Sequence, residues 1–333
     1  MNMKSWKGVR VAVTGAGGFI GSHLTEELAR RGAAVRALVR YNSRTHWGFL
    51  ERTEPALARR IDVLSGDLTD PYLIDKLVAG NEVVFHLGAL IAIPYSYQAP
   101  AQYVETNVKG TLHVLEASLR HKVKKVVHTS TSEVYGTALY APIDEKHPRQ
   151  GQSPYSATKI GADALVESFH RSFGLPTAIA RPFNTYGPRQ SARAVIPTIA
   201  SQILAGSPVV RVGSVSPVRD FNFVADTVEG FLAIAGSPSA VGTDINLGSG
   251  RAVTIGETAH LLMKLCGRTV PIATDRARIR PRKSEVLRLI CDNRKARRLI
   301  GWRPLWTLEK GLAATVDYVR SHLDDYKPAR YNV

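Results

Sequence analysis

Tyr155 and Lys159 are the pair of residues whose types and spacing best suit acid–base chemistry. Tyr155 directly precedes the helical pattern Ser156–Phe173, and Lys159 lies in its first turn. A spacing of four residues places both side chains on one face of a helix. A tyrosine pKa near 10 must fall by about three units, or about 4 kcal/mol, before the phenolate can accept a hydroxyl proton at neutral pH. One cation ~4 Å away supplies about that much at an effective dielectric constant of about 20. The spacing therefore predicts a tyrosine base tuned by Lys159, and an ordinary exposed helix turn is the alternative interpretation.

A polar segment at the end of a preceding strand strengthens this interpretation. The stretch Val127–Gly136 follows an apolar run and carries Thr131, Ser132 and Glu133. Taken alone, the Tyr-x-x-x-Lys pattern is weak evidence. Its position after a Ser/Thr-rich strand end, and behind an N-terminal glycine loop, predicts an active site that contains these five side chains.

The glycine loop lies between the predicted strand Val9–Thr14 and the predicted helix Ile20–Arg31. Gly15 permits the sharp turn, Gly18 lets the backbone approach a pyrophosphate, and Gly21 lets the helix and strand pack closely. The helix N-terminus then offers unpaired N–H groups and its positive dipole end to the phosphates. The loop predicts a dinucleotide site, and a tight structural turn is the alternative.

The residues after the second predicted strand decide which dinucleotide is expected. An Asp or Glu there would hold the ribose 2′-hydroxyl of NAD, but this chain has Arg40, Ser43 and Arg44. Arginine forks and a hydroxyl suit a 2′-phosphate, so tightly bound NADP is expected, and NAD with solvated arginines is the alternative. Asp67 and Leu68, after the third strand, are expected to flank the adenine. The expected cofactor contacts are Gly15, Gly18, Phe19, Ile20, Gly21, Arg40, Ser43, Arg44, Asp67, Leu68, Leu87, Tyr155 and Lys159.

Apolar runs alternate with amphipathic stretches up to about residue 180. Strands separated by such helices predict right-handed βαβ units, and hence an α/β fold with a Rossmann-type doubly wound parallel sheet. The predicted strands are Val9–Thr14, Ala34–Val39, Asp62–Ser65, Val83–Leu87, Lys125–Ser130 and Thr177–Arg181. The predicted helices are Ile20–Arg31, Asp70–Val78, Val104–Arg120 and Ser156–Phe173.

The regular alternation ends after Arg181, where prolines become frequent. A strand-and-helix pattern returns at Phe221–Ala235 and Asp244–Leu247. We therefore expect a dinucleotide-binding Rossmann domain over residues 1–180, with 221–247 returning to it. A smaller α+β substrate domain is expected from residues 181–220 and 248–333.

The composition argues against several other classes of protein. The formal net charge is +16, but the arginines are spread along the chain without a basic tail, so nucleic acid is not expected as a partner. No apolar run approaches the ~18 residues of a membrane span, and no signal-peptide pattern precedes the first strand, so a cytoplasmic protein without a membrane partner is expected. Cys266 and Cys291 lack metal-ligand spacing, so reduced thiols and no metal site are expected.

These features together resemble the extended short-chain dehydrogenase/reductases that act on nucleotide sugars. Within that group the chain is most similar to the 4,6-dehydratases, especially those that make 4-keto-6-deoxy-N-acetylglucosamine for legionaminic-acid-type sugars. The segment Val39–Arg44 is also similar to the NADP-using GDP-mannose 4,6-dehydratases, and Gly88 is a slight departure, since relatives often have alanine there. The motifs that carry the resemblance are Thr14–Gly21, Phe85–Ala89, Asn107–Thr111, Thr129–Gly136, Tyr155 with Lys159, Arg181–Arg189 and Arg219–Val224.

The resemblance implies a role for each catalytic candidate. Thr131 would hydrogen-bond the sugar 4-hydroxyl, and Tyr155, tuned by Lys159, would remove its proton as hydride passes from C4 to the nicotinamide. Glu133 would take the C5 proton that the 4-ketone acidifies. Water would then leave C6, where hydride returns, so that the cofactor is recycled. Ser132 would be a nearby proton relay, but glucose-type dehydratases usually carry Asp at that position, so the acid for the leaving water stays open.

The substrate that the resemblance implies is UDP- or GDP-N-acetylglucosamine, or a related nucleotide-linked hexose. Asn184, Arg193, Arg219 and Arg280 are its expected contacts, since arginine forks suit a diphosphate. Each arginine could instead be a surface ion-pair partner.

A homodimer is also implied by the resemblance. Its interface would use the helices Val104–Arg120 and Ser156–Phe173, which carry more apolar positions than one buried face requires.

Three alternatives stay open. A decarboxylase of nucleotide-sugar uronic acids shares the Thr-Ser-Glu-Val-Tyr-Gly motif, and a C4 epimerase generally lacks the Glu beside that Ser/Thr. The alternative from a different class is a non-catalytic redox sensor that binds a dinucleotide. Such sensors tend to lose the Tyr or the Lys, and this chain has both.

Overall fold

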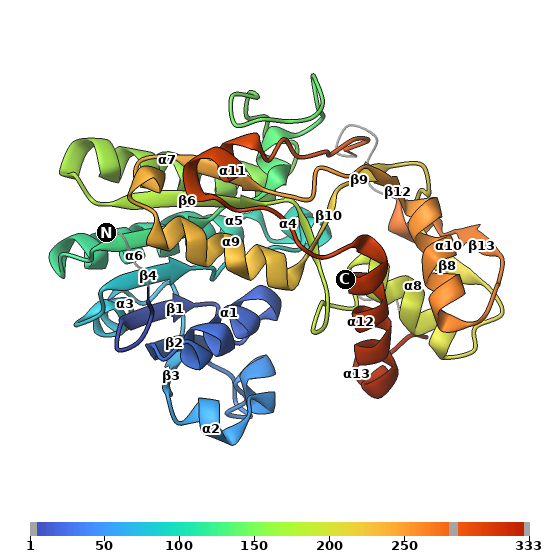
Figure 1. Ribbon diagram of the computed structural model, residues 1–333, viewed down its shortest axis with the longest axis horizontal. Helices are drawn as coiled ribbons and strands as arrows, with labels where there is room; N and C mark the ends of the chain where they lie inside the picture. Colours follow the sequence, from blue (N-terminus) through green and yellow to red (C-terminus); the bar gives the residue numbers. More distant parts are fainter. Residues whose placement is uncertain (1–4, 280–285, 330–333) are drawn as a thin grey trace.

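Seven parallel strands form the central sheet of the computed structural model, which describes residues 5–279 and 286–329 (Figure 1). The strand order is β11-β6-β5-β4-β1-β2-β3, so the chain runs outward from β1 to β3, crosses back to β4 and continues to β11. This doubly wound order confirms the predicted fold class. The strands are β1 (Arg10–Thr14), β2 (Ala34–Arg40), β3 (Ile61–Gly66), β4 (Val83–His86), β5 (Lys125–Thr129), β6 (Thr177–Pro182) and β11 (Asp244–Leu247).

Both faces of the sheet are covered, and its inner strands are accordingly buried along almost their whole length. Every residue of β6 and all but the first residue of β1 are buried. Side chains alternate between the faces, so Val11 and Val13 pack into one hydrophobic core and Ala12 packs into the other. The register pairs Thr14 with both Leu38 and His86, which brings the carboxyl ends of β1, β2 and β4 to one edge.

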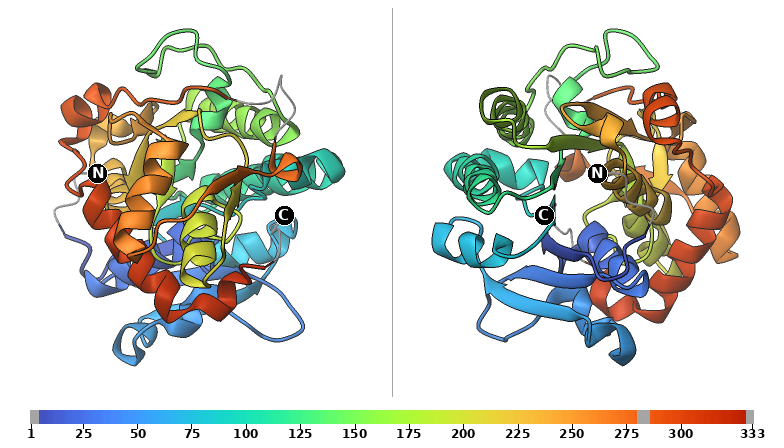
Figure 2. Two further views of the ribbon diagram at one scale, coloured as in Figure 1. Left: turned by 90° about the vertical axis from the view of Figure 1, so that its right-hand side faces the viewer. Right: turned by 60° about the vertical axis from the view of Figure 1, so that its left-hand side comes forward.

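Two sets of helices lie on opposite sides of the sheet (Figure 2). One set joins Val11 in its core and contributes Leu24 and Phe231, both fully buried. The other packs against Ala12 and contributes Val114. The first set is α1 (Phe19–Arg30), α9 (Val224–Gly236) and α11 (Arg294–Ile300), and the second is α3 (Pro71–Val78), α6 (Gly110–Arg120) and α7 (Pro154–Phe173).

Shorter helical segments connect these layers. They include a π-helix that leads directly into α6. Within residues 5–279 and 286–329, no helix combines the length and the apolar character that crossing a membrane requires. The short segments are η1 (Gly48–Arg52), α2 (Pro55–Ala58), α4 (Ile93–Gln98), α5 (Pro100–Tyr103), η2 (Val104–Lys109), η3 (Ser132–Tyr135) and η4 (Pro238–Ala240).

A smaller lobe extends from one end of the sheet, on the right in Figure 1. Its own core contains Ile199, Leu262 and Val316, one from each of three helices. Three two-stranded pairs complete it: β7 with β10, β8 with β13, and β9 with β12. Its elements are β7 (Asn184–Tyr186), α8 (Val195–Leu204), β8 (Val210–Val212), β9 (Val218–Arg219), β10 (Phe221–Phe223), β12 (Val253–Thr254), α10 (Ile255–Cys266), β13 (Ile272–Thr274), η5 (Arg276–Arg278), α12 (Leu308–Ser321) and α13 (Leu323–Tyr326).

The chain returns to the sheet before its last helices. Ala296 and Trp302 belong to the core of the sheet, so the segment 248–333 does not lie wholly in the smaller lobe as expected. The reason is Asp226 in α9, whose carbonyl oxygen accepts the indole N–H of Trp302 over 2.9 Å and whose carboxylate accepts the N–H of Leu305, also over 2.9 Å. The domain boundaries themselves stay a prediction.

Phe231 offers a test of this packing. Phe231→Ala should lower the free energy of unfolding by about 3–5 kcal/mol, because it leaves a cavity between α9 and the sheet. Tyr72→Ala, at an 87% exposed position, is the control and should cost less than about 1 kcal/mol. Chemical denaturation followed by circular dichroism measures both, and equal losses would contradict the assigned core.

Candidate active site

A cavity of about 1020 Å³ lies along the carboxyl edge of the sheet and reaches the smaller lobe. Its walls come from the turns after β1, β4 and β5, from the start of α7 and from the segments around β7 and β9. Ligands of doubly wound sheets bind at this edge. The predicted site residues that line it are Gly15, Gly18, Phe19, Ile20, Gly21, Arg40, Leu87, Thr131, Ser132, Glu133, Tyr155, Asn184, Arg193 and Arg219.

The glycine loop forms a cradle that side chains would fill. Gly15 has φ +68°, a conformation that strains any other residue. A Cβ on Gly21 would collide with the Gly15 carbonyl oxygen, and one on Gly17 would lie 2.6 Å from the Trp47 oxygen. Gly18 caps α1 without a side chain, so the first N–H groups of the helix have no side-chain cap. These features fit a dinucleotide pyrophosphate.

Thr14 joins this loop to β4 through a buried histidine. Its hydroxyl donates to His86 Nδ1 over 2.8 Å, and its oxygen accepts the Gly88 N–H over 2.9 Å. His86 Nε2 donates to the Thr111 hydroxyl over 3.0 Å, so both ring nitrogens are used. Burial holds the pKa of His86 well below its ordinary value, which keeps the ring neutral. A set of neutral hydrogen bonds therefore fixes the turn.

The residues beyond β2 reach the cavity only in part. Arg40 lines it, but Ser43 and Arg44 are exposed outside its lining. Asn42 and His46 line it in their place. The Asn42 carboxamide accepts the His46 N–H over 3.1 Å and donates to the His46 carbonyl oxygen over 2.7 Å. Sequence reasoning missed these two residues, although an asparagine that turns the backbone around its own side chain is a recognisable signal.

Asp67 and Leu68 do not line the cavity. The Asp67 carboxylate accepts the N–H of Thr69 over 3.0 Å and its hydroxyl over 2.9 Å. Leu68 is buried in the core beside α3 and α6. A Cβ on Gly88 would lie 2.7 Å from the end of the Leu68 side chain and 3.2 Å from the Thr14 hydroxyl, so the chain packs closely at this departure from the family pattern. Leu68 supports the turn after β4 from behind.

The polar segment after β5 reaches the cavity as predicted. Thr131 caps the helix η3 by accepting the Glu133 N–H over 3.3 Å. Ser132 is buried, whereas Thr131 and Glu133 are half-buried. All three side chains therefore meet in one wall of the cavity.

Tyr155 enters the same wall from the first turn of α7. The Ser153 hydroxyl accepts the Ser156 N–H over 3.1 Å, and the Ser156 hydroxyl accepts the Ser153 N–H over 3.0 Å, which starts the helix at Pro154. The Tyr155 ring packs edge-on against Tyr103, with centroids 6.3 Å apart. The N-terminal end of a helix favours negative charge, so this position suits a phenolate.

The surroundings of Tyr155 raise its pKa instead of lowering it. Burial is the largest cause, and the charge of Glu133 acts in the same direction, while a hydrogen bond with Thr131 opposes both. The Tyr155 phenol therefore interacts with both Thr131 and Glu133. Lowering the pKa of Tyr155 toward neutral pH therefore requires more positive charge than these neighbours supply.

Lys159 is one turn further along α7 and does not line the cavity. Its Nζ lies 3.5 Å from His128 Nε2, and no hydrogen bond joins it to Tyr155 among the described residues. The contact that the structure shows for this buried ammonium is with His128, and the expected tuning of Tyr155 by Lys159 stays a prediction. Burial lowers the pKa of Lys159 to about 8, and the charge of Asp163 opposes that shift.

The smaller lobe contributes the residues expected to hold a nucleotide sugar. Asn184 on β7, Arg219 on β9 and Arg193 before α8 line the cavity. Arg280 lies outside the described residues. Gln190, which sequence reasoning missed, also lines it, and its buried Oε1 has no hydrogen-bond partner in the part of the chain that the structure describes.

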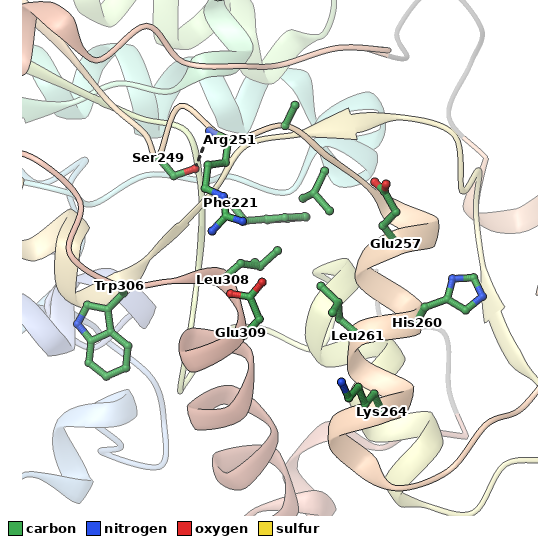
Figure 3. A pocket seen from close by; sticks show the side chains of 12 residues that line it. Phe221, Ser249, Arg251, Glu257, His260, Leu261, Lys264, Trp306, Leu308 and Glu309 are labelled. Atoms are coloured by element: carbon green, nitrogen blue, oxygen red, sulfur yellow. Dashed lines mark hydrogen bonds between the residues drawn. The ribbon is translucent and has the colours of Figure 1, made fainter.

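A second hollow of about 490 Å³ lies on the smaller lobe between α10 and α12 (Figure 3). Phe221 lines both hollows. The second one contains none of the predicted site residues that the structure describes, and the Glu257 carboxylate at its rim is engaged in capping α10. The acid–base groups therefore belong to the larger cavity.

Comparisons with known proteins show the family to which this chain belongs. The sequence profile of the GDP-mannose 4,6 dehydratase family matches residues 12–315. A dTDP-glucose 4,6-dehydratase of Actinoplanes sp. is 32% identical over 94% of this chain and 98% of its own length, and a UDP-glucose 4-epimerase of Mycolicibacterium smegmatis is 33% identical over 94% and 99%. The structure of a dTDP-glucose 4,6-dehydratase from Streptomyces venezuelae with NAD bound is 29% identical, with a TM-score of 0.83 over 97% of this chain and all of that one. From its sequence and its fold alike, this chain belongs to the GDP-mannose 4,6-dehydratase family, among nucleotide-sugar dehydratases and 4-epimerases.

Proposed function

We propose that the protein is a redox-neutral nucleotide-sugar 4,6-dehydratase that acts on UDP- or GDP-N-acetylglucosamine or a related nucleotide-linked hexose. The observation that carries this proposal is the Glu133 carboxylate, which lines the same cavity as Tyr155 and acts on its phenol. A dehydratase must remove the C5 proton before water can leave C6. An epimerase needs no base at C5, and a decarboxylase loses carbon dioxide without removing that proton.

Three residues would divide the proton chemistry between them. Thr131, which hydrogen-bonds Tyr155, would hold the sugar 4-hydroxyl against the phenol. Tyr155 would take the proton of that hydroxyl as the 4-ketone forms. Glu133 would then take the C5 proton, which the ketone has made acidic. Ser132 is buried beside them and would relay a proton toward the leaving water.

The dinucleotide would lie on the glycine cradle of Gly15, Gly18 and Gly21. When bound, its oxidised nicotinamide would accept hydride from C4, return it at C6 and add positive charge near Tyr155. NADP is the proposed form, because Arg40 lines the cavity beyond β2 and no acidic residue occurs in the ten positions after that strand. NAD is the second candidate, since solved relatives have NAD bound.

The nucleotide sugar would be held by Asn184, Arg193 and Arg219, which line the far end of the cavity. Arginine forks bind diphosphate oxygens in pairs, which would orient the sugar toward Tyr155. A 4-epimerase is the second candidate function, because relatives with that activity match the chain as well as dehydratases do.

Glu133→Gln tests the assignment. The variant should still allow the substrate to reduce bound cofactor, but loss of the C5 base should slow dehydration by about 10²–10⁴-fold. Mass spectrometry after incubation with a panel of nucleotide sugars measures loss of water, and in deuterium oxide the wild type should place one deuterium at C5. Glu54→Gln, at an exposed position, is the control. A product of unchanged mass would indicate an epimerase, and release of carbon dioxide from a uronic acid would indicate a decarboxylase.

The identity of the cofactor can be checked directly. Denaturing the purified protein should release NADP, and recovery of NAD alone would overturn the choice. Arg40→Asp should shift the preference toward NAD by about tenfold or more, because it replaces a phosphate-binding cation by a ribose-binding acid. Arg44→Asp changes charge equally but outside the cavity lining, so its shift should be smaller.

A homodimer through α6, α7 and the adjoining η2 is the proposed assembly. Val104 and Phe173, on these helices, are 46% and 57% exposed in the single chain. Light scattering at micromolar concentration should report twice the mass of 36.4 kDa. Phe173→Asp should weaken the dimer, whereas Tyr72→Asp on α3 should not. A monomeric wild type would contradict the proposal.

A further inference from the structure

A cluster of buried polar side chains lies next to Lys159, outside the cavity lining. His128, Asp163 and Arg181 are fully buried, and Lys159 is only 4% exposed. They come from β5, α7 and β6, so three elements meet at this point. Charges removed from water in this way require partners, because an unpaired ion in the interior is very costly.

Asp163 provides the negative charge of the cluster. Its Oδ2 accepts the Ser130 hydroxyl over 2.7 Å and an Arg181 N–H over 3.0 Å. Burial opposes its ionisation, but the neighbouring His128, 3.4 Å away, and the charges of Arg181 and Lys159 lower its pKa well below the usual range. The carboxylate is therefore ionised, and it follows Lys159 by four residues on the same face of α7.

His128 stands between the lysine and the carboxylate. Its Nε2 lies 3.5 Å from Lys159 Nζ and 3.4 Å from Asp163 Oδ1. A neutral imidazole nitrogen either accepts or donates one hydrogen bond, so it cannot serve both neighbours at once. Consistent with that limit, His128 Nδ1 and Asp163 Oδ1 have no hydrogen-bond partner among the described residues.

The neighbouring histidine, His86, has a separate hydrogen-bond partner for each ring nitrogen. The His86 ring is 5.3 Å from that of His128, but its two nitrogens bond to Thr14 and Thr111. Burial, the ammonium of Lys159 and the charge of Arg181 lower the pKa of His128 to about 4, although Asp163 opposes them. His128 is therefore a neutral acceptor for Lys159 near neutral pH, and His86 is a fixed structural group.

We infer that Asp163 and His128 are positioning residues for the reaction: Asp163 supplies the counter-charge that keeps Lys159 an ammonium, and His128 holds that ammonium beside the Tyr155 site. This inference rests on the proposed role of Tyr155 as the base. The groups around Lys159 are His128 from β5, His86 from β4 and Asp163 from its own helix, with Arg181 of β6 behind Asp163. Tyr155 lies one turn earlier on the same face of α7. Asp163 is the one anion among them.

The consequence for pH follows from the sign of each charge. An ammonium favours the Tyr155 phenolate, so activity falls as rising pH removes the Lys159 proton. Burial already draws the pKa of Lys159 down to about 8, and the Asp163 charge limits that fall. Removing the Asp163 charge should lower the pKa of Lys159 further and move the alkaline limb of the activity profile toward neutral pH.

The test measures the protonation of Lys159 without any turnover. In the full chain labelled with ¹⁵N-lysine, the Lys159 side-chain resonance, assigned by its loss in Lys159→Met, is titrated by NMR. Asp163→Asn should lower the pKa of Lys159 by about one unit or more, a tenfold loss of proton affinity. His128→Phe should lower it in the same direction while leaving the Arg181–Asp163 pair intact. His128→Gln carries both an acceptor and a donor, so it should restore a value near that of the wild type.

The alkaline limb of the pH profile for dehydration should move with the NMR values, through kcat more than KM. His147→Gln, at another buried histidine, is the control and should leave both unchanged. Thermal melting shows which variants fold, and if Asp163→Asn does not, His128→Phe and His128→Gln carry the test. An unchanged pKa of Lys159 in the folded variants would overturn the inference. A shifted pKa in a protein that dehydrates no sugar would overturn only the proposed function.

Discussion

The Arg181 guanidinium of β6 is fully buried, and three other elements of the fold supply its partners. It donates to Asp163 on α7 over 3.0 Å, to Asp244 on β11 over 2.7 Å and to the Tyr135 hydroxyl in η3 over 2.8 Å. The Tyr135 ring also lies under the cation, 5.0 Å from its centre. Removing one partner from such a set leaves a buried charge and costs about 3–5 kcal/mol. The position of α7 relative to β5 and β6 is therefore strongly constrained, and Tyr155 and Lys159 move with α7.

Neutral hydrogen bonds connect the glycine loop, at one end of the cavity, to α7 and Tyr155 at the other. Asn107 accepts the Leu90 N–H over 2.8 Å and donates to the Thr158 hydroxyl over 3.1 Å, so the turn after β4 is tied to α7. Thr14 and His86 tie that turn to the glycine loop. These contacts are neutral and lie in buried or half-buried positions, so they constrain the spacing between the glycine cradle and Tyr155. A reaction that sends hydride out and back needs such a fixed distance.

The smaller lobe is held to the sheet by carboxylates that accept backbone N–H groups. Asp220, next to Arg219, accepts the N–H groups of Ser249 and Gly250 over 2.8 Å and that of Cys291 over 3.0 Å. Burial raises the pKa of Asp220, and these hydrogen bonds oppose the rise. Asp220 thereby holds the neighbouring Arg219 at the cavity, so that distant parts of the chain share one of its walls.

The sequence by itself determined the sheet, its flanking helices and the glycine loop, because each depends on local periodicity and on residues within a short stretch. The six predicted strands and three of the predicted helices of the first half appear with ends shifted by at most two residues, and the fourth, Val104–Arg120, is divided into η2 and α6. The sequence also predicted that Thr131, Glu133 and Tyr155 share one site, because the carboxyl ends of parallel strands lie along one edge of the sheet. All three residues line the same cavity. Only the tertiary structure decided that Lys159 contacts His128 and that Asp163 pairs with Arg181. It also decided that Arg44, Asp67 and Leu68 stay outside the cavity. The physical reason is that local pattern fixes which face a side chain takes, whereas the partner of a buried charge depends on elements that are far apart in the chain.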